Sequence, residues 1–220
     1  MARLARIVIP GLPHHVTQRG NGRAQTFFQP SDYRLYCDLL ASSCAASGVE
    51  VWAWVLMPNH VHLVLVPEDG DGLRKALSQT HRRYAGIIHA RERRTGHFWQ
   101  GRFGAVVMDE AHLVAALRYI AFNPVRARLV VRPSQWAWSY VHAALSGADD
   151  GLTKIAPLRD RISDFAAFLE QEAEEGLLKR LRQAETIGRP LGDQDFIERL
   201  EYMTGRSLMP QKRGPTKDRV

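Results

Sequence analysis

The chain has 220 residues, of which 45% are hydrophobic and 24% charged, a composition typical of a globular protein. This length suffices for one good core, or for one core with a small appendage. The formal net charge is +7 and the sequence pI is about 9.8, which favours a polyanionic partner: nucleic acid first, an anionic membrane surface second. A basic enzyme without such a partner has the same charge, so charge alone does not decide between them.

No signal for export or membrane insertion is evident in the sequence. The basic segment 1–12 has only a short, proline-broken apolar run. Segment 49–66 is apolar enough to mimic a membrane span, but it contains a glutamate, a proline and two histidines. Cys37 and Cys44 fall in one predicted helix, roughly 10 Å apart, which is too far for a disulfide. Free thiols favour a reducing compartment, so we predict a cytoplasmic protein that binds no membrane.

Periodicity and turn residues predict the elements of the first half of the chain. They are a strand over 14–19, a helix from Ser31 or Asp32 to about Ser47, and two strands over 50–56 and 60–66. Gly48 is expected to end the helix. The last two strands are apolar on both faces, so we expect them to be central and covered.

The second half is predicted to be mainly helical. We expect a helix over 71–91, a strand over 103–108, a helix from an Asp109 cap to about Asn123, where Pro124 ends it, and a helix over 133–145. The order strand–helix–strand–strand–helix–strand predicts an α+β, ferredoxin-like antiparallel sheet packed by helices. From about residue 147 the composition changes, which divides the chain into a main domain, 1–146, and a helical C-terminal extension with a basic tail, 147–220.

Two histidines stand two residues apart in the buried strand LMPNHVHLVLV, residues 56–66. Alternate residues of a strand share a face, so His60 and His62 point to the same side and can bind one metal ion. Two structural histidines would give the same pattern, and two imidazoles rarely complete a metal site. A third protein ligand is therefore required.

A candidate for that ligand lies in LRYIAFNPVRA, residues 117–127. Tyr119 and Asn123 are four residues apart on a predicted helix, so they lie on nearly the same face, beside the apolar stripe. Asn123 offers a carbonyl oxygen to a metal, and Tyr119 offers a phenol as nucleophile. A half-buried tyrosine and an asparagine near a helix end are both common, so this pair is informative only together with the histidines.

Taken together, four segments resemble the single-tyrosine, His-hydrophobic-His (HUH) transposase superfamily. They are HHVTQRGNGR, MPNHVHLVL, TGHFWQGRF and LRYIAFNPVRA, which lie within residues 14–145. Asparagine four residues after the tyrosine, NPVRA and the GRPLG of the tail most resemble the REP-associated tyrosine transposases, because smaller insertion-sequence transposases usually have glutamine at the asparagine position. The resemblance implies a catalytic domain over 1–146, single-stranded DNA hairpin substrates and a divalent metal.

The resemblance implies that Tyr119 attacks a DNA phosphodiester to give a 5′-phosphotyrosine and a free 3′-OH, so that strands are cleaved and rejoined. It implies that His60, His62 and Asn123 hold the metal. Imidazoles favour zinc or nickel, and amide and phosphate oxygens favour magnesium or manganese; the resemblance points to Mg²⁺ or Mn²⁺.

Basic residues of the region 74–102, which runs from the predicted helix over 71–91 into the loop with Trp99, are the predicted DNA-binding surface, since arginine neutralises phosphates and tryptophan stacks on bases. Arg19 is added by the resemblance. The candidates are Arg19, Arg74, Arg82, Arg83, Arg93, Arg94, Trp99 and Arg102. A solvated helix face explains the arginines about as well, and core packing is the favoured role of Trp99. A monomer is slightly preferred over a homodimer.

Two other functions remain open at this level. A non-catalytic nucleic-acid-binding module on the same fold would need the basic surface but not Tyr119. A metal-dependent hydrolase that activates water would be expected to carry more acidic or histidine ligands near the pair.

Overall fold

The computed structural model describes residues 6–171 and 174–208. Its sheet has four strands in the order β2-β3-β1-β4, all neighbours antiparallel. The strands are β1 (His14–Arg19), β2 (Val49–Met57), β3 (His60–Pro67) and β4 (Gly104–Val107). The predicted α+β, ferredoxin-like architecture is confirmed by this strand order and by the helices that cover the sheet.

Two long helices, α1 (Pro30–Ala45) and α2 (Gly72–Glu92), connect the strands. Beyond β4 follow α3 (Glu110–Ala121), α4 (Asn123–Arg126), α5 (Val141–Ser146), α6 (Ala156–Arg159), α7 (Phe165–Glu170), α8 (Glu175–Ile187) and α9 (Gln194–Thr204). Short 3₁₀ turns are η1 (Asn21–Arg23) and η2 (Pro133–Gln135). No helix in the described part of the chain combines the length and the apolar character needed to cross a bilayer.

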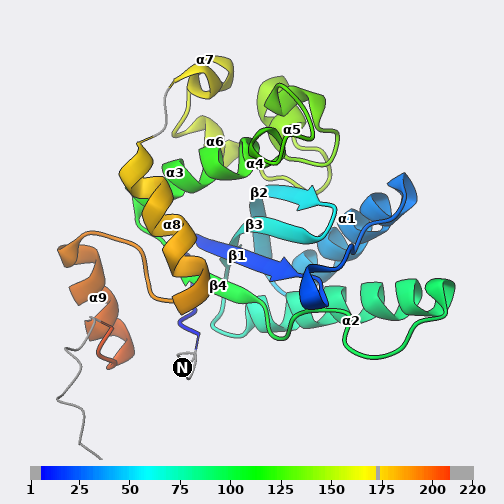
Figure 1. Ribbon diagram of the computed structural model, residues 1–220. Helices are drawn as coiled ribbons and strands as arrows, with labels where there is room; N and C mark the ends of the chain where they lie inside the picture. Colours follow the sequence, from blue (N-terminus) through cyan, green and yellow to red (C-terminus); the bar gives the residue numbers. More distant parts are fainter. Residues whose placement is uncertain (1–5, 172–173, 209–220) are drawn as a thin grey trace, which may run out of the picture.

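The sheet is covered on both faces, as its strands' apolar character predicts (Figure 1). Helices α1 and α2 pack against each other and against β2 and β3, while α3 and α8 cover the other side. Strand register assigns residues to the faces, because directly paired residues point to the same side. Thr17 pairs with His62 and Arg19 pairs with His60, so these four residues share the face that α3 covers.

The predicted helix from Asp109 to Asn123 is wrong at its end. Helix α3 stops at Ala121, and Phe122 (φ −88°, ψ 2°) leaves helical geometry. Pro124 has no N–H to donate back into the preceding turn, but the first turn of a new helix needs none there. Pro124 therefore lies in the first turn of α4 rather than after a longer α3, and Asn123 becomes the first residue of α4.

The predicted helix over 133–145 is also wrong, because its middle pairs with the sheet instead. The amide of Leu56 donates to the carbonyl of Trp138 at 3.0 Å, and the amide of Tyr140 donates to the carbonyl of Trp54 at 3.0 Å. This extended segment satisfies backbone groups on the outer edge of β2, which a helix could not reach. Only η2 and α5 remain helical on either side of it.

Described residues of 147–191 contribute to the same core as the sheet, whereas the buried residues of α9 pack in a second apolar cluster with Ile7, Ile9 and Val107. Phe165, Phe168, Leu181 and Leu191 are buried in one continuous apolar cluster with strand residues. Leu191 also pairs with the strand end: its amide donates to the carbonyl of Val107 at 2.9 Å. The extension thus covers α3 and the outer edge of β4, while the division into 1–146 and 147–220 stays a prediction. The predicted basic tail, from residue 209, lies outside the described residues.

Candidate active site

The two histidines of β3 lie side by side on one face, as their spacing predicts. Their ring centroids are 5.0 Å apart and the rings are nearly perpendicular, at 83°. His62 is only 2% exposed, and His60 is half-buried at the start of the strand. Flanking residues Val61 and Leu63 are fully buried on the opposite face and fix the strand in the core.

Helix α3 places Tyr119 over this pair. The phenol ring lies 5.4 Å from the ring of His62, edge to face at 83°, and is 8% exposed. The guanidinium of Arg126, from α4, lies 4.2 Å above the centre of the phenol ring and donates a hydrogen bond to the backbone carbonyl of Tyr119. The kink between α3 and α4 thus brings a cation onto the predicted nucleophile.

Asn123 meets the same pair from the start of α4. Its side chain is buried, at 8% exposure, and forms a hydrogen bond with the side chain of His60. The structure therefore brings the predicted nucleophile, Tyr119, together with the three predicted metal ligands: His60, His62 and Asn123.

Burial keeps both imidazoles neutral. Desolvation lowers the pKa of His60 to about 4, with the charge of Arg19 adding to the effect and the bond to Asn123 opposing it. Desolvation also lowers the pKa of His62 well below its usual value, and the neighbouring His15 adds to this. A neutral imidazole is the form that binds a metal, so the rings are in the correct protonation state at neutral pH.

His15 is a site residue that the sequence did not reveal. From β1, its Nε2 lies 3.0 Å from Nδ1 of His62, and the two rings stack at 5.2 Å. Its ring also meets that of Tyr119 edge to face at 6.0 Å. A signal was present, since His15 lies on the same face of its strand as Arg19, but only the pairing of β1 with β3 makes it informative.

The residues present fit a divalent metal. Nδ1 of His60 is hydrogen-bonded to the side-chain oxygen of Asn59 at 2.6 Å, and Nδ1 of His62 lies 3.0 Å from Nε2 of His15, so protein partners fix the orientation of both rings. Within residues 6–171 and 174–208, no three His, Cys, Asp or Glu residues cluster as a metal site. The third ligand predicted from the sequence, Asn123, is of another type, and its side chain lies against His60.

The family comparison adds to this geometry. A family model described as "Transposase IS200 like" matches residues 9–123, just over half of the chain. The chain belongs to the IS200-like transposase family. This matched segment ends at Asn123 and contains the histidine pair and Tyr119.

Two solved structures are similar to this transposase. The first is titled "Structure of the REP associates tyrosine transposase bound to a REP hairpin"; it is 23% identical, with a TM-score of 0.58, and the match covers 70% of this chain and 90% of that chain. A putative transposase from Deinococcus radiodurans is 20% identical over 58% of this chain and 92% of that chain, with a TM-score of 0.38. The first likeness shows the fold. No curated protein matches the chain.

A cleft in the transposase opens beside the histidine pair. Its lining includes His60 and His62 together with three arginines: Arg19, Arg23 and Arg102. Arg23 belongs to η1, where both Gly22 and Arg23 have positive φ angles, 57° and 62°. A positive φ is uncommon for a residue other than glycine. Two of the predicted DNA-binding arginines, Arg19 and Arg102, thus line the cleft, and Arg23 is an addition to the set.

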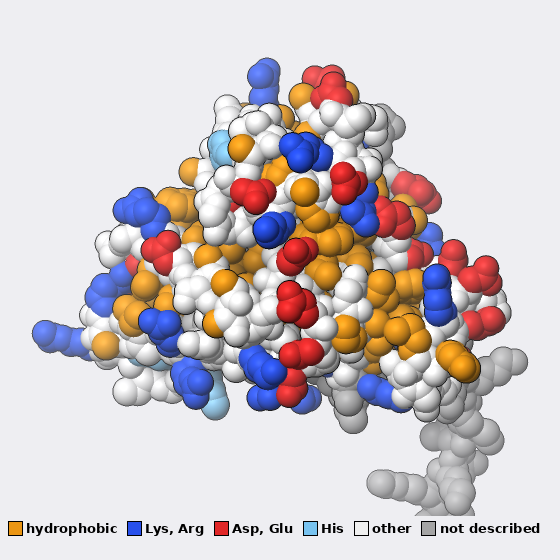
Figure 2. All heavy atoms as spheres, turned by 180° about the vertical axis from the view of Figure 1, so that it is seen from behind, with side chains coloured by type: hydrophobic (Ala, Val, Ile, Leu, Met, Phe, Trp, Pro, Cys, Tyr) orange, Lys and Arg blue, Asp and Glu red, His pale blue; other side chains and the backbone are white. Residues whose placement is uncertain are grey.

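The remaining predicted arginines lie apart from the cleft. Arg74, Arg82 and Arg83 are exposed on α2, which covers the opposite face of the sheet, and Arg74 pairs with Asp71 at 3.0 Å. Figure 2 shows Lys and Arg side chains gathered along the edge where α2 lies. Arg93 and Arg94 follow the last turn of this helix.

Trp99 lies in an aromatic cluster beneath this basic edge. Its indole N–H donates to the carbonyl of His81 at 3.1 Å, and its ring contacts those of Tyr84 and Phe98. The side chain is partly buried, so packing against α2 is its observed role. Its stacking on a DNA base stays a prediction.

Proposed function

We propose that this transposase cleaves and rejoins single-stranded DNA beside hairpin, REP-like sequences through a 5′-phosphotyrosine intermediate. The observation that carries the proposal is the position of Tyr119, whose ring lies 5.4 Å from that of His62 in the same chain. A nucleophile, two neutral imidazoles and an amide meet at the edge of a basic cleft. Tyrosine is one of the side chains that can form a covalent intermediate as a nucleophile.

Chemically, the Tyr119 oxygen attacks the scissile phosphorus and forms a phosphotyrosine bond. The bond from phosphorus to the 3′ oxygen breaks, and that oxygen leaves as a 3′-OH after gaining a proton. A phenol has a reference pKa near 10, so its anion is far more accessible than a serine alkoxide. One phosphodiester replaces another, so a 3′-OH can reverse the step and rejoin strands without ATP.

Each neighbouring residue has a physical role in this scheme. Arg126, 4.2 Å above the phenol ring, holds that ring in place through a cation–π contact. His15 holds the ring of His62 in one orientation through its hydrogen bond. Arg19, Arg23 and Arg102 bind backbone phosphates in the cleft. A divalent ion, Mg²⁺ or Mn²⁺, at His60, His62 and Asn123 would supply electrostatic stabilisation of the charge that develops on the phosphate.

A DNA hairpin is the inferred partner, and a monomer the inferred working unit. The similar solved structure is of a transposase bound to a REP hairpin, which supports a hairpin here. Because Tyr119 lies over the histidines of its own chain, one protomer carries every residue of the proposed site. A second chain is not required to complete it.

Replacing Tyr119 with phenylalanine tests the function directly. Incubation with a hairpin oligonucleotide and Mg²⁺ or Mn²⁺ should give a protein–DNA band on a denaturing gel for the unaltered chain and none for Tyr119→Phe, with hairpin binding nearly unchanged. Tyr202→Phe is the matched control, because Tyr202 is 92% exposed, and it should keep the band. Cleaved DNA without a covalent band would indicate a water-based hydrolase, and intact DNA a binding module.

A further inference from the structure

A second pocket lies on the other side of the 3₁₀ turn η1 from the catalytic cleft. We call it the turn pocket and define it by six of its lining residues: Asn21, Gln25, Phe28, His89, Arg94 and Phe98. Asn21 and Arg23 belong to the same three-residue turn, yet Asn21 lines this pocket and Arg23 lines the cleft. A strand of DNA that crosses this turn would therefore contact both the catalytic cleft and the turn pocket.

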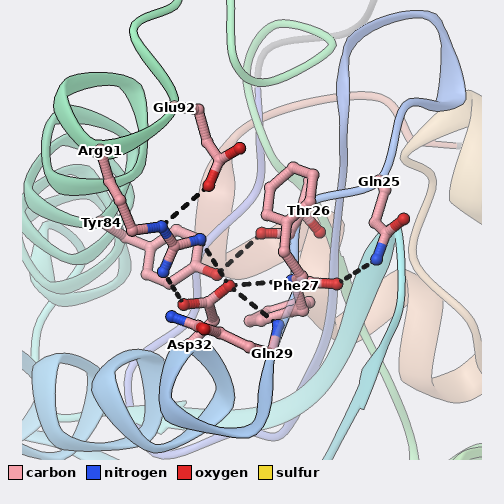
Figure 3. A network of polar contacts seen from close by, with 9 residues as sticks. Gln25, Thr26, Phe27, Gln29, Asp32, Tyr84, Arg91 and Glu92 are labelled. Carbon is pink, nitrogen blue, oxygen red and sulfur yellow. Dashed lines mark hydrogen bonds and ion pairs between the residues drawn. The ribbon is translucent and has the colours of Figure 1, made fainter.

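A network of polar contacts beside the turn pocket holds the backbone of its surrounding segments in place (Figure 3). Arg91, in the last turn of α2, pairs with both carboxylate oxygens of Asp32 on α1. Asp32 in turn accepts a hydrogen bond from the amide of Phe28 at 2.8 Å. The Tyr84 hydroxyl donates to the carbonyl of Thr26 at 2.8 Å. These bonds hold the segment before α1 against the end of α2, and a preformed wall reduces the entropy lost on binding.

His89 is the unexplained group of this pocket. Both of its ring nitrogens are screened from solvent, and neither has a hydrogen-bond partner in the part of the chain that the structure describes. Buried polar atoms are nearly always paired, so each exception asks for a reason. Side-chain rotamers commonly change on binding, and a turn of this imidazole toward the pocket would let an entering polar group supply the missing partners.

Aromatic and cationic groups surround His89. Phe98 meets its ring edge to face at 5.2 Å, and the guanidinium of Arg94 lies 5.9 Å from the ring centre of Phe28. Asn21 and Gln25 add amide groups to the lining. Flat apolar surfaces, a few amide and imidazole hydrogen-bonding groups and an adjacent cation match a nucleobase and its phosphate.

We propose that the turn pocket binds one unpaired base of the single-stranded DNA that leaves the catalytic cleft. The proposal rests on the proposed function, since it needs DNA in that cleft. Phe28 and Phe98 provide the apolar surface for the base, His89 hydrogen-bonds its edge, and Arg94 and Arg23 bind the phosphates on either side. The pocket thereby reads sequence next to the hairpin, outside the atoms that react.

A binding experiment tests the pocket without requiring cleavage. The probe is a REP-type DNA hairpin with single-stranded arms, together with copies that each carry one abasic position, and the protein is the full chain carrying Tyr119→Phe. Adding His89→Leu should weaken binding of the intact probe about tenfold, the effect of a lost hydrogen bond in a binding site. At one arm position, the abasic probe should bind the two proteins equally, because the base that His89 contacts is gone.

Stability separates this role from a structural one. His89→Leu removes two unpaired buried nitrogens, so its melting temperature should be unchanged or higher while its DNA affinity falls. His142→Leu, an exposed histidine on α5, is the control and should alter neither quantity. Equal affinity of His89→Leu and its parent, or no arm position with coupling, overturns the pocket proposal. Covalent adduct formation by the chain with Tyr119 is scored separately, so either proposal can fail alone.

Discussion

Both sides of the sheet bury histidines, and burial lowers the pKa of these rings on both. On the side of α1 and α2, the pKa of His14 falls to about 4 and that of His81 to about 3. His14 bonds through one ring nitrogen to the Leu12 carbonyl and through the other to a backbone amide, and His81 bonds to the Tyr36 hydroxyl. These partners are internal, so both rings belong to the packing of the fold.

The side covered by α3 differs in what surrounds the histidine rings. His60 is hydrogen-bonded to the side chains of Asn59 and Asn123 and His62 to that of His15, and both rings line an arginine-bearing cleft under Tyr119. Burial and low pKa are thus common to structural and functional histidines. Their position distinguishes them, because His60 and His62 line the cleft while His14 and His81 are enclosed in the packing.

The largest contrast is expected between His62 and His81. His62→Ala should reduce the rate of adduct formation by folded protein about 10²–10³-fold, because the proposed metal position loses a ligand, besides the stability lost with a buried ring and its bond to His15. His81→Leu should leave that rate unchanged for folded protein but lower the free energy of unfolding by about 1–3 kcal/mol, since the buried hydroxyl of Tyr36 loses its partner. Adduct kinetics and urea unfolding of both variants measure this. Similar rates for the two would refute the contrast.

His15 should behave as a positioning residue, with an effect on metal binding that is smaller than that of His62 but larger than that of His81. His15→Phe keeps a ring but removes the nitrogen that bonds His62, so Mn²⁺ affinity should fall about 10–100-fold. His15→Gln restores a hydrogen-bonding group and should recover part of that loss. Titration calorimetry with Mn²⁺ measures both. Unchanged affinity in His15→Phe would mean that the contact only packs the core.

Acid should destabilise the fold through the structural histidines. The folded pKa of His14 is about 4, below the unfolded value near 6.5, so the unfolded chain binds a proton first as pH falls. The stability is complete above pH 6.5 and decreases as the pH falls toward 4. At pH 5 His14 alone accounts for about 2 kcal/mol. Urea unfolding of His14→Gln between pH 7.5 and 5 should show a shallower decline than the parent; parallel curves would contradict this.

The smallest expected effect is on the salt dependence of DNA binding, where arginines of the cleft are compared with arginines of α2. Arg102→Ala should reduce the slope of log K against log salt by about 0.7, the value for one phosphate contact with single-stranded DNA. Arg74→Ala should change it less, because Arg74 is exposed on the opposite face and paired with Asp71. Fluorescence anisotropy across a salt series compares them. Equal slopes would place DNA on the α2 side as well.

Most of the sheet and the central pair of the site follow from local patterns. The strand over 14–19 coincides with β1, and the observed starts of β2 and β3 lie within one residue of those predicted, because apolar runs bounded by turns define strands. The relation of His60 to His62 is set by strand geometry alone. The meeting of Tyr119 with these histidines was anticipated through resemblance, since no local rule fixes how α3 crosses the sheet.

The features that could not be predicted from local sequence patterns depend mainly on contacts between segments far apart in the chain. Segment 136–140 has a helical pattern, but the unsatisfied edge of β2 draws it into extended pairing. His15 acquires its meaning only when β1 pairs with β3 in one register. The break between α3 and α4 could not be predicted locally, because a proline fits equally well after the last turn of one helix and in the first turn of the next, where Pro124 lies.

The bonds along the outer strands also bear on association between copies. An uncovered strand edge is a template on which another chain can add its own strand. Here segment 136–140 occupies the β2 side, Lys154 donates to the Val51 carbonyl at 2.8 Å, and Leu191 closes the end of β4. Two molecules could join through a shared, enlarged sheet only after displacing these segments.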